Sequence, residues 1–172
     1  MAADEFTEMK VHRLVLDPNT KSPIVILLAE ETGVLLPIWI GIFEAHAIAM
    51  KMEDIESPRP MTHDLLSNAI QVMNGMVDRV EVVDLVDNTY FARVYFQVKD
   101  QRFSLDSRPS DAIALALRSP SPIFVANHVL EKSKIDPIPE GEGDGEAAVD
   151  DDEKWTKLLK NYNPPGGREK LN

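Results

Sequence analysis

The sequence contains no cysteine, which excludes disulfide bonds, zinc–thiolate sites and a cysteine nucleophile. It also contains no uninterrupted apolar run of about 18 residues, the length that a membrane-spanning helix needs. The first eight residues, Met1–Glu8, lack both the basic start and the apolar stretch of a secretion signal. These absences lead us to expect a cytoplasmic protein that does not associate with membranes.

Basic residues are scarce relative to acidic ones. The 172 residues include 18 Lys and Arg against 29 Asp and Glu, which gives a formal net charge of -11. Residues 1–136 hold 13 basic and 20 acidic residues, and residues 137–172 hold 5 and 9. An acidic surface opposes broad electrostatic binding to phosphate backbones. A polyanion would therefore have to be bound by local arginines or by metal ions.

Several well-known functional motifs are absent as well. The sequence has no glycine-rich phosphate-binding loop, no dinucleotide fingerprint, no Gly-x-Ser-x-Gly elbow and no His-Glu-x-x-His zinc motif. Methionine and aromatic residues fall on predicted core faces, so they require no cofactor. Any chemistry must therefore come from a less common arrangement of side chains.

Length and composition predict one compact domain with a tail. The predicted segments are a flexible N-terminus at residues 1–8, a domain at 9–136, an acidic Pro/Gly linker at 137–153, and a short amphipathic helix and tail at 154–172. In the last segment Trp155, Leu158 and Leu159 share one helix face. This segment is either a helix that docks on its own domain or on a partner, or a disordered tail with transient helicity.

Hydrophobic patterning predicts the elements of the domain. Alternating or β-branched runs predict strands at 9–16, 23–29, 34–40, 77–86, 89–98, 102–105 and 123–125. Helical spacing predicts helices at 41–52, 62–74, about 109–118 and 127–134. In the second helix the predicted buried face is Leu65, Leu66, Ala69, Ile70 and Met73. The order β-β-β-α-α-β-β-β-α-β-α indicates an α+β fold, a mainly antiparallel or mixed sheet packed with about three core helices.

The densest functional signal is the stretch Asp106–Arg118, where a group of charges runs into an apolar helix. Ser107, Pro109 and Ser110 are typical of a helix start, and the following residues Ala112–Leu117 are apolar on every face. Such a helix should be largely buried, so its charged first turn is set into the protein. Because unpaired buried charge is costly, Asp106, Arg108 and Asp111 need partners elsewhere in the chain.

A second segment shares this design. Arg59–Asp64 and Arg108–Asp111 each place Arg-Pro before a hydroxyl residue and an aspartate at a helix start. In one interpretation, Arg59 and Arg108 pair with Asp64, Asp106 or Asp111 in a buried ion network that fixes two helices against the sheet. In the other, the two helix starts form a polar cleft in which Arg59 and Arg108 bind phosphate while carboxylates bind a metal or activate water. The two interpretations are compatible.

Among the candidate site residues, His63 is the leading titratable group, because it lies beside Asp64 and imidazole exchanges a proton near neutral pH. A lone histidine is nevertheless more often a surface or capping residue. Glu44 and Ser110 are further candidates for the same cleft, although an exposed helix position is the more common role for such a glutamate. The candidate ligands of a divalent cation, Mg²⁺ or Mn²⁺, are Asp64, Asp106 and Asp111.

The motifs that carry a family resemblance are Leu36–Gly41, Glu44-Ala45, Arg59–Leu66, Asp84–Asp87 and Arg108–Ala116. Together, and in this order, they resemble the bifunctional nuclease domain family over residues 9–135. The resemblance implies an intracellular protein of a family named for the DNase and RNase activity of some plant members, and it carries over positions rather than catalytic roles. Two positions depart from the family pattern: Ser107 stands where alanine is common, and Asn88 stands where a hairpin glycine is common. Asparagine tolerates left-handed turn geometry, so the hairpin is still expected.

Two functional hypotheses follow. In the first, the chain is a metal-assisted nuclease of low sequence specificity that acts on DNA or RNA. Arg59 and Arg108 bind phosphate, His63, Asp64 and Asp111 are catalytic, and the aspartates hold the cation. In the second, the chain is a non-catalytic oligomeric binding or regulatory module whose Arg/Asp/His cluster is structural. A homo-oligomer is expected in either case.

Overall fold

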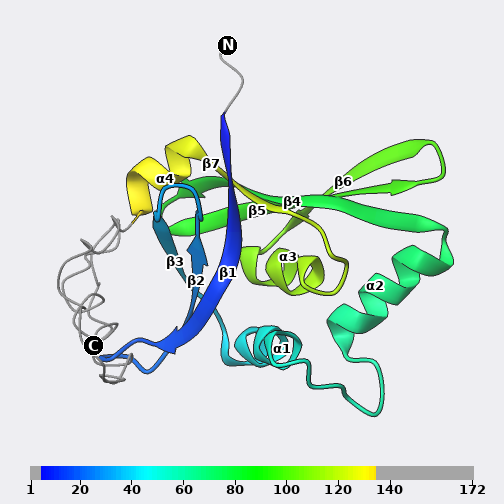
Figure 1. The fold of residues 1–172 in the computed structure, drawn as a ribbon, viewed down its shortest axis with the longest axis horizontal. Helices are drawn as coiled ribbons and strands as arrows, with labels where there is room; N and C mark the ends of the chain where they lie inside the picture. Colours follow the sequence, from blue (N-terminus) through cyan, green and yellow to red (C-terminus); the bar gives the residue numbers. More distant parts are fainter. Residues whose placement is uncertain (1–4, 135–172) are drawn as a thin grey trace.

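The computed structural model describes residues 5–134 and shows the predicted element order (Figure 1). The strands are β1 (Phe6–Leu16), β2 (Pro23–Leu28), β3 (Leu35–Trp39), β4 (Gly75–Val86), β5 (Thr89–Val98), β6 (Gln101–Ser107) and β7 (Ile123–Ala126). The helices are α1 (Ile42–Met52), α2 (Thr62–Val72), α3 (Pro109–Ala116) and α4 (Asn127–Ser133). The α+β class is confirmed.

Within these residues, the strands form one seven-stranded mixed sheet in the order β3-β2-β1-β7-β4-β5-β6. Every strand pair is antiparallel except β4–β7, which is parallel. The hairpin from β4 to β5 turns through Asp87 and Asn88, both with positive φ (47° and 61°). Aspartate and asparagine tolerate this geometry better than other non-glycine residues, so the expected hairpin forms without a glycine.

The N-terminal strand is longer than its pattern predicted. Alternation suggested a start at Met9, but β1 begins at Phe6, and Phe6 to Met9 pair with β7. Residues 6–8, expected to belong to a flexible N-terminus, therefore lie in the sheet. The predicted acidic linker and C-terminal amphipathic helix lie outside the described residues.

Helices α1, α2 and α3 lie on one side of the sheet, and α4 lies on the other (Figure 1). Helix α3 is the buried one, as predicted: Ala112 to Ala116 are each at most 3% exposed. It contacts α1, α2, β4 and β5, so its apolar residues are covered on every face. Burying side chains such as Ile113 and Leu115 contributes roughly 1.5–3 kcal/mol each. This packing fixes the start of α3 inside the molecule.

The predicted buried face of α2 is confirmed for Ile70 and wrong for Leu65, Leu66, Ala69 and Met73. Leu65 is 63% exposed and Met73 50% exposed, whereas the buried residues are His63, Ser67 and Ile70. The physical reason is polar pairing with the α3 segment: His63 binds Asp111, and Ser67 Oγ lies 3.0 Å from Ser119 Oγ. Helix α2 therefore turns a partly polar stripe toward α3 and leaves apolar side chains at the surface.

Candidate functional site

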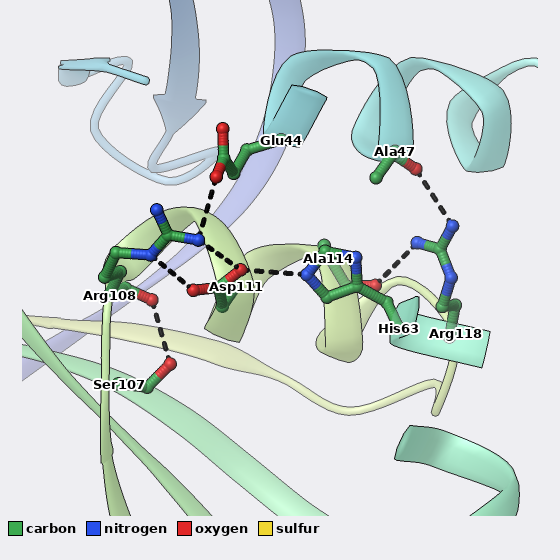
Figure 2. A network of polar contacts seen from close by, with 8 residues as sticks. All are labelled: Glu44, Ala47, His63, Ser107, Arg108, Asp111, Ala114 and Arg118. Carbon is green, nitrogen blue, oxygen red and sulfur yellow. Dashed lines mark hydrogen bonds and ion pairs between the residues drawn. The ribbon is translucent and has the colours of Figure 1, made fainter. Parts of the chain in front are cut away.

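Polar side chains from three helices meet near the start of α3. Glu44 comes from the first turn of α1, His63 from the first turn of α2, and Arg108 and Asp111 from the N-cap and first turn of α3. Figure 2 shows Arg108, Asp111 and His63 in a row, with Glu44 above the guanidinium of Arg108. The structure thus brings together two helix starts that share the Arg-Pro design, as the sequence predicted.

Asp111 is the centre of this cluster. Its Oδ1 atom lies 2.9 Å from His63 Nε2, and its Oδ2 atom accepts a hydrogen bond from Arg108 Nε at 2.6 Å. A second Arg108 nitrogen, Nη2, donates to Oδ1 at 3.1 Å, so the Arg108–Asp111 pair is bidentate. Pro109, the first residue of α3, has its φ preset for a helix start and places Arg108 and Asp111 within one turn.

Glu44 extends the cluster to α1. Its Oε1 atom lies 2.8 Å from Arg108 Nη2, and its side chain is only 17% exposed. The carboxylate folds back over Gly41, where an added Cβ would collide with Glu44 Oε2. The glycine at the N-cap of α1 thus leaves room for this position of the Glu44 carboxylate. The sequence indicated Glu44 as a candidate site residue, although a solvent-exposed helix position was the more common expectation for such a glutamate.

A second ion pair, which the sequence analysis missed, lies beside the first. Arg118 donates from Nε to Asp64 Oδ1 at 2.5 Å, from Nη1 to the carbonyl of Ala114 at 2.9 Å, and from Nη2 to that of Ala47 at 3.0 Å. The Arg118 side chain is 7% exposed, so it joins α1, α2 and the end of α3 from the inside. The available signal was an arginine directly after the apolar helix, where a cation interacts with the last carbonyls.

The network affects the acidity of both aspartates. Burial alone raises the pKa of Asp111, but the hydrogen bonds from Arg108 and His63 outweigh it and hold the pKa below its ordinary value. At Asp64, burial also raises the pKa. The hydrogen bonds from the Met61 N–H and from Arg118 outweigh this effect, so the pKa of Asp64 is lowered too. Both side chains are therefore ionised at neutral pH.

The exposed fraction of the side chains falls from Arg108 through Asp111 to His63. The Arg108 side chain is 64% exposed, that of Asp111 31% and that of His63 11%. Solvent and a phosphate group can therefore reach Arg108 directly, whereas His63 lies deeper. An aspartate that binds one imidazole nitrogen orients the ring. Arg108 binds Asp111 and Glu44 through Nε and Nη2, so its Nη1 group is the one left for an oxyanion.

Three other candidates lie apart from the row. Arg59 is exposed in the loop before α2 and forms no ion pair with a carboxylate of the described residues, so Asp64 pairs with Arg118 instead. Asp106 lies opposite Arg93 in the β5–β6 register and is exposed. Since side chains alternate along a strand, Asp106 points to the face of the sheet opposite the helices. Ser110 is buried in the first turn of α3.

These positions do not fit a metal site with the predicted ligands. The oxygens of Asp64 bind Met61 N–H and Arg118, those of Asp111 bind His63 and Arg108, and Asp106 lies on the other face. In the part of the chain that the structure describes, no group of three or more His, Cys, Asp or Glu residues could hold a metal ion. We therefore derive no catalytic step through a metal. Among the same residues, no helix has the length and apolar character needed to cross a membrane.

The fold and the site together define a mixed α+β domain. In this domain, polar side chains from the first turns of α1 and α2 meet those at the start of the buried helix α3. Comparison with known proteins identifies the family. Residues 25–137 match the family model of the bifunctional nuclease domain. The chain belongs to the bifunctional nuclease domain family.

Individual relatives fall into two groups. An uncharacterized protein of Mycobacterium tuberculosis is 33% identical over 159 residues, which are 91% of this chain and 95% of the relative. Bifunctional nuclease 2 of Arabidopsis thaliana is 29% identical over 140 residues, 80% of this chain and 43% of the plant protein. Bifunctional nuclease 1 of rice, Oryza sativa subsp. japonica, is 28% identical over 109 residues, 62% of this chain and 33% of its own length. The alignments thus cover less than half of the plant proteins.

Proposed function

We propose that this protein is a nuclease that hydrolyses phosphodiester bonds in DNA or RNA with low sequence specificity. One observation carries the proposal: an exposed arginine and a nearly buried histidine bind the same carboxylate, Asp111, at 2.6 and 2.9 Å. An anion-binding group thus stands beside an oriented acid–base group. The membership of the chain in the bifunctional nuclease domain family supports phosphodiesters as the substrate class.

In the proposed reaction, Arg108 binds a non-bridging oxygen of the phosphate and compensates the charge that develops there. Asp111 accepts a hydrogen bond from the N–H of His63 Nε2, which leaves Nδ1 as the nitrogen that takes a proton from the attacking water; this tautomer is assigned from the hydrogen bond. The water oxygen bonds to phosphorus, and the bond to the leaving oxygen breaks. The leaving oxygen takes a proton from solvent water, and His63 releases the proton it received to solvent, so the site returns to its starting state. Glu44 positions Arg108, and Asp64 with Arg118 positions the start of α2.

Three further expectations belong to this proposal. Stimulation by Mg²⁺ or Mn²⁺ stays a prediction, tested by measuring the melting temperature and the hydrolysis rate with each ion and with a chelator. The cytoplasm stays the predicted compartment, since nucleic acid substrates are present there. Assembly into a homo-oligomer also stays a prediction.

The decisive experiment compares variants of the cluster with a matched histidine variant. Plasmid nicking and RNA cleavage are measured across a sizing column, and the activity should follow the protein peak. Asp111→Asn and His63→Gln should each reduce the rate by about 10²–10⁴-fold, the usual contribution of general acid–base catalysis. His46→Gln changes an exposed histidine of α1 outside the cluster and should leave the rate unchanged. Activity that separates from the protein, or that survives in both cluster variants, would sink the proposal.

A second candidate function is the non-catalytic oligomeric module. The observation that favours it is the apolar surface of α2, where Leu65 is 63% and Val72 82% exposed. Monomeric proteins rarely leave a large contiguous apolar patch uncovered. In this reading the cluster only locks three helices together, as Arg118 does through two backbone carbonyls. It predicts that Arg108→Ala unfolds the protein or breaks its oligomer, whereas the nuclease predicts loss of hydrolysis by a folded protein.

A further inference from the structure

The face of the sheet opposite α1–α3 carries a second group of arginine and aromatic side chains. Residues directly opposite one another on neighbouring strands share a face, and the register aligns Arg79 with Tyr95 and Ser104. The adjoining row contains Gln97 and Arg102. Among the described residues, α4 is the only helix on this side. It contacts β3, β4 and β7 and lies away from the β5–β6 hairpin (Figure 1).

Arg79 is held in place on this face by two carboxylates and one aromatic ring. Its Nε atom donates to Glu81 Oε1 at 2.6 Å, and its Nη1 atom donates to Asp78 Oδ2 at 2.8 Å. The guanidinium carbon lies 4.1 Å from the centroid of the Tyr95 ring. Two carboxylates and one ring therefore fix the plane of a guanidinium whose side chain is still 35% exposed. The remaining surface of this plane is a preorganised stacking platform for a flat ring.

A hollow adjoins the platform. Its volume is about 310 Å³, at the lower end of the range for small-ligand sites, and its lining includes Arg79, Tyr95, Gln97, Arg102 and Ser104. Arg102 is exposed on the edge strand β6, and no carboxylate of the described residues forms an ion pair with it. The hollow thus combines a flat cationic surface, amide and hydroxyl groups and an available guanidinium.

The balance of charges on this face favours single-stranded over double-stranded nucleic acid. The cations Arg79, Arg93 and Arg102 are balanced by Asp78, Glu81 and Asp106 on the same strands. A surface without net positive charge has little attraction for a duplex, whose binding depends on phosphate contacts. Unpaired bases, in contrast, expose flat faces that stack on aromatic rings and on arginine planes. The face therefore suits a single strand.

We propose that the outer face of β4, β5 and β6 binds single-stranded nucleic acid, with one base stacked on Arg79 over Tyr95 and a neighbouring phosphate on Arg102. This surface lies on the side of the sheet opposite Arg108, Asp111 and His63. The inference adds to the proposed function a binding surface outside the site of hydrolysis. It does not depend on that activity.

Binding is tested by fluorescence anisotropy with the full chain and a labelled phosphorothioate oligothymidylate, which resists hydrolysis. Arg79→Lys keeps the charge but removes the flat plane, and it should weaken binding about tenfold, the scale of one lost base stack. Arg102→Ala should also weaken binding. Lys10→Ala removes one positive charge from β1, where Lys10 pairs with Glu30, and should change nothing. Each variant is first shown to be folded by its melting curve.

Two further measurements sharpen the test. The slope of log affinity against log salt should be shallow, about −0.7 for each phosphate contacted, and the matching duplex should bind more weakly than the single strand. The proposal is overturned if the wild-type chain does not bind the oligothymidylate, or if it binds the duplex equally well. It is also overturned if Arg102→Ala, a change on an exposed edge strand, binds as the wild type does. Loss of hydrolysis in Asp111→Asn with unchanged oligothymidylate binding would separate this surface from the proposed nuclease site.

Discussion

His63 Nε2 lies 2.9 Å from Asp111 Oδ1 and joins the first turns of α2 and α3 across 48 positions of sequence. This contact turns a partly polar stripe of α2 toward the most buried helix of the molecule. It also links the imidazole of His63 to the exposed Arg108, because both side chains bind Asp111. The same geometry can serve catalysis or stability, and substitutions of the residues that it joins separate the two roles.

Arg108→Ala should impair hydrolysis far more than folding. The Arg108 side chain is 64% exposed, and ion pairs at such positions contribute only about 0–1 kcal/mol to the free energy of unfolding. Loss of a phosphate-binding arginine, in contrast, should reduce plasmid nicking by at least about tenfold, the equivalent of one charge-assisted hydrogen bond. Urea denaturation and nicking rates are compared with those of Lys10→Ala. A folded Arg108→Ala protein with full activity would contradict the assigned role.

Arg118→Met, unlike Arg108→Ala, should lower the free energy of unfolding clearly. Arg118 is 7% exposed, and its removal leaves Asp64 and the carbonyls of Ala47 and Ala114 without this donor. Because the Asp64 side chain that stays behind is 34% exposed, the cost is that of hydrogen bonds lost by partly buried groups, about 1–3 kcal/mol. Urea denaturation should therefore show a loss of this size.

Two comparisons sharpen the Arg118 prediction. Arg118→Lys keeps the charge but cannot bind three acceptors in the same fork, so its loss should fall between that of Arg118→Met and the wild type. Lys10→Ala, at an exposed ion pair, should stay within about 0.5 kcal/mol of the wild type. A free energy of unfolding for Arg118→Met within the same margin would show that the three hydrogen bonds contribute nothing measurable.

Local signals in the sequence were sufficient for the order of the elements and for the two charged helix starts. They were insufficient for the choice of partners. Asp64 pairs with Arg118 rather than Arg59, because the end of α3 returns next to the start of α2. Sequence spacing places two charges on one turn, but it does not show which charge from another element will arrive there. Asp106 illustrates the same point, because strand alternation turns it to the opposite face of the sheet.

The misjudged face of α2 has a related cause. Helical spacing of Leu65, Leu66 and Met73 correctly indicates an apolar stripe, and it does not say what covers that stripe. In this chain, His63 and Ser67 face α3 because they hydrogen-bond to Asp111 and Ser119. The apolar stripe is consequently left at the surface. That a second copy of the chain covers this stripe in an oligomer is a separate prediction.

Val72→Glu tests that prediction. Val72 is 82% exposed, so the change should alter the free energy of unfolding of the monomer by no more than about 0.5 kcal/mol. If copies of the chain associate through α2, a charge in the contact should convert the oligomer into a monomer, as measured by light scattering after size exclusion. The matched control is Glu131→Gln in α4, an exposed position remote from α2. An oligomer that is unchanged in Val72→Glu would exclude this face as the contact.

Acid should destabilise the protein through Asp64 and Asp111. The pKa of each is lowered in the folded state from an ordinary value of 3.8, so the unfolded chain binds protons first as the pH falls. The stability that these two groups contribute is complete well above pH 3.8, and it is lost progressively as the pH falls through the lowered folded-state values. Urea midpoints measured in steps down to this range should therefore decline with acid. Asp64→Asn and Asp111→Asn should each be less stable at neutral pH and decline less steeply, because one of the titrating groups is gone. A variant that starts lower and yet declines as steeply as the wild type would show that its aspartate is not held in the charged form by Arg118 or Arg108.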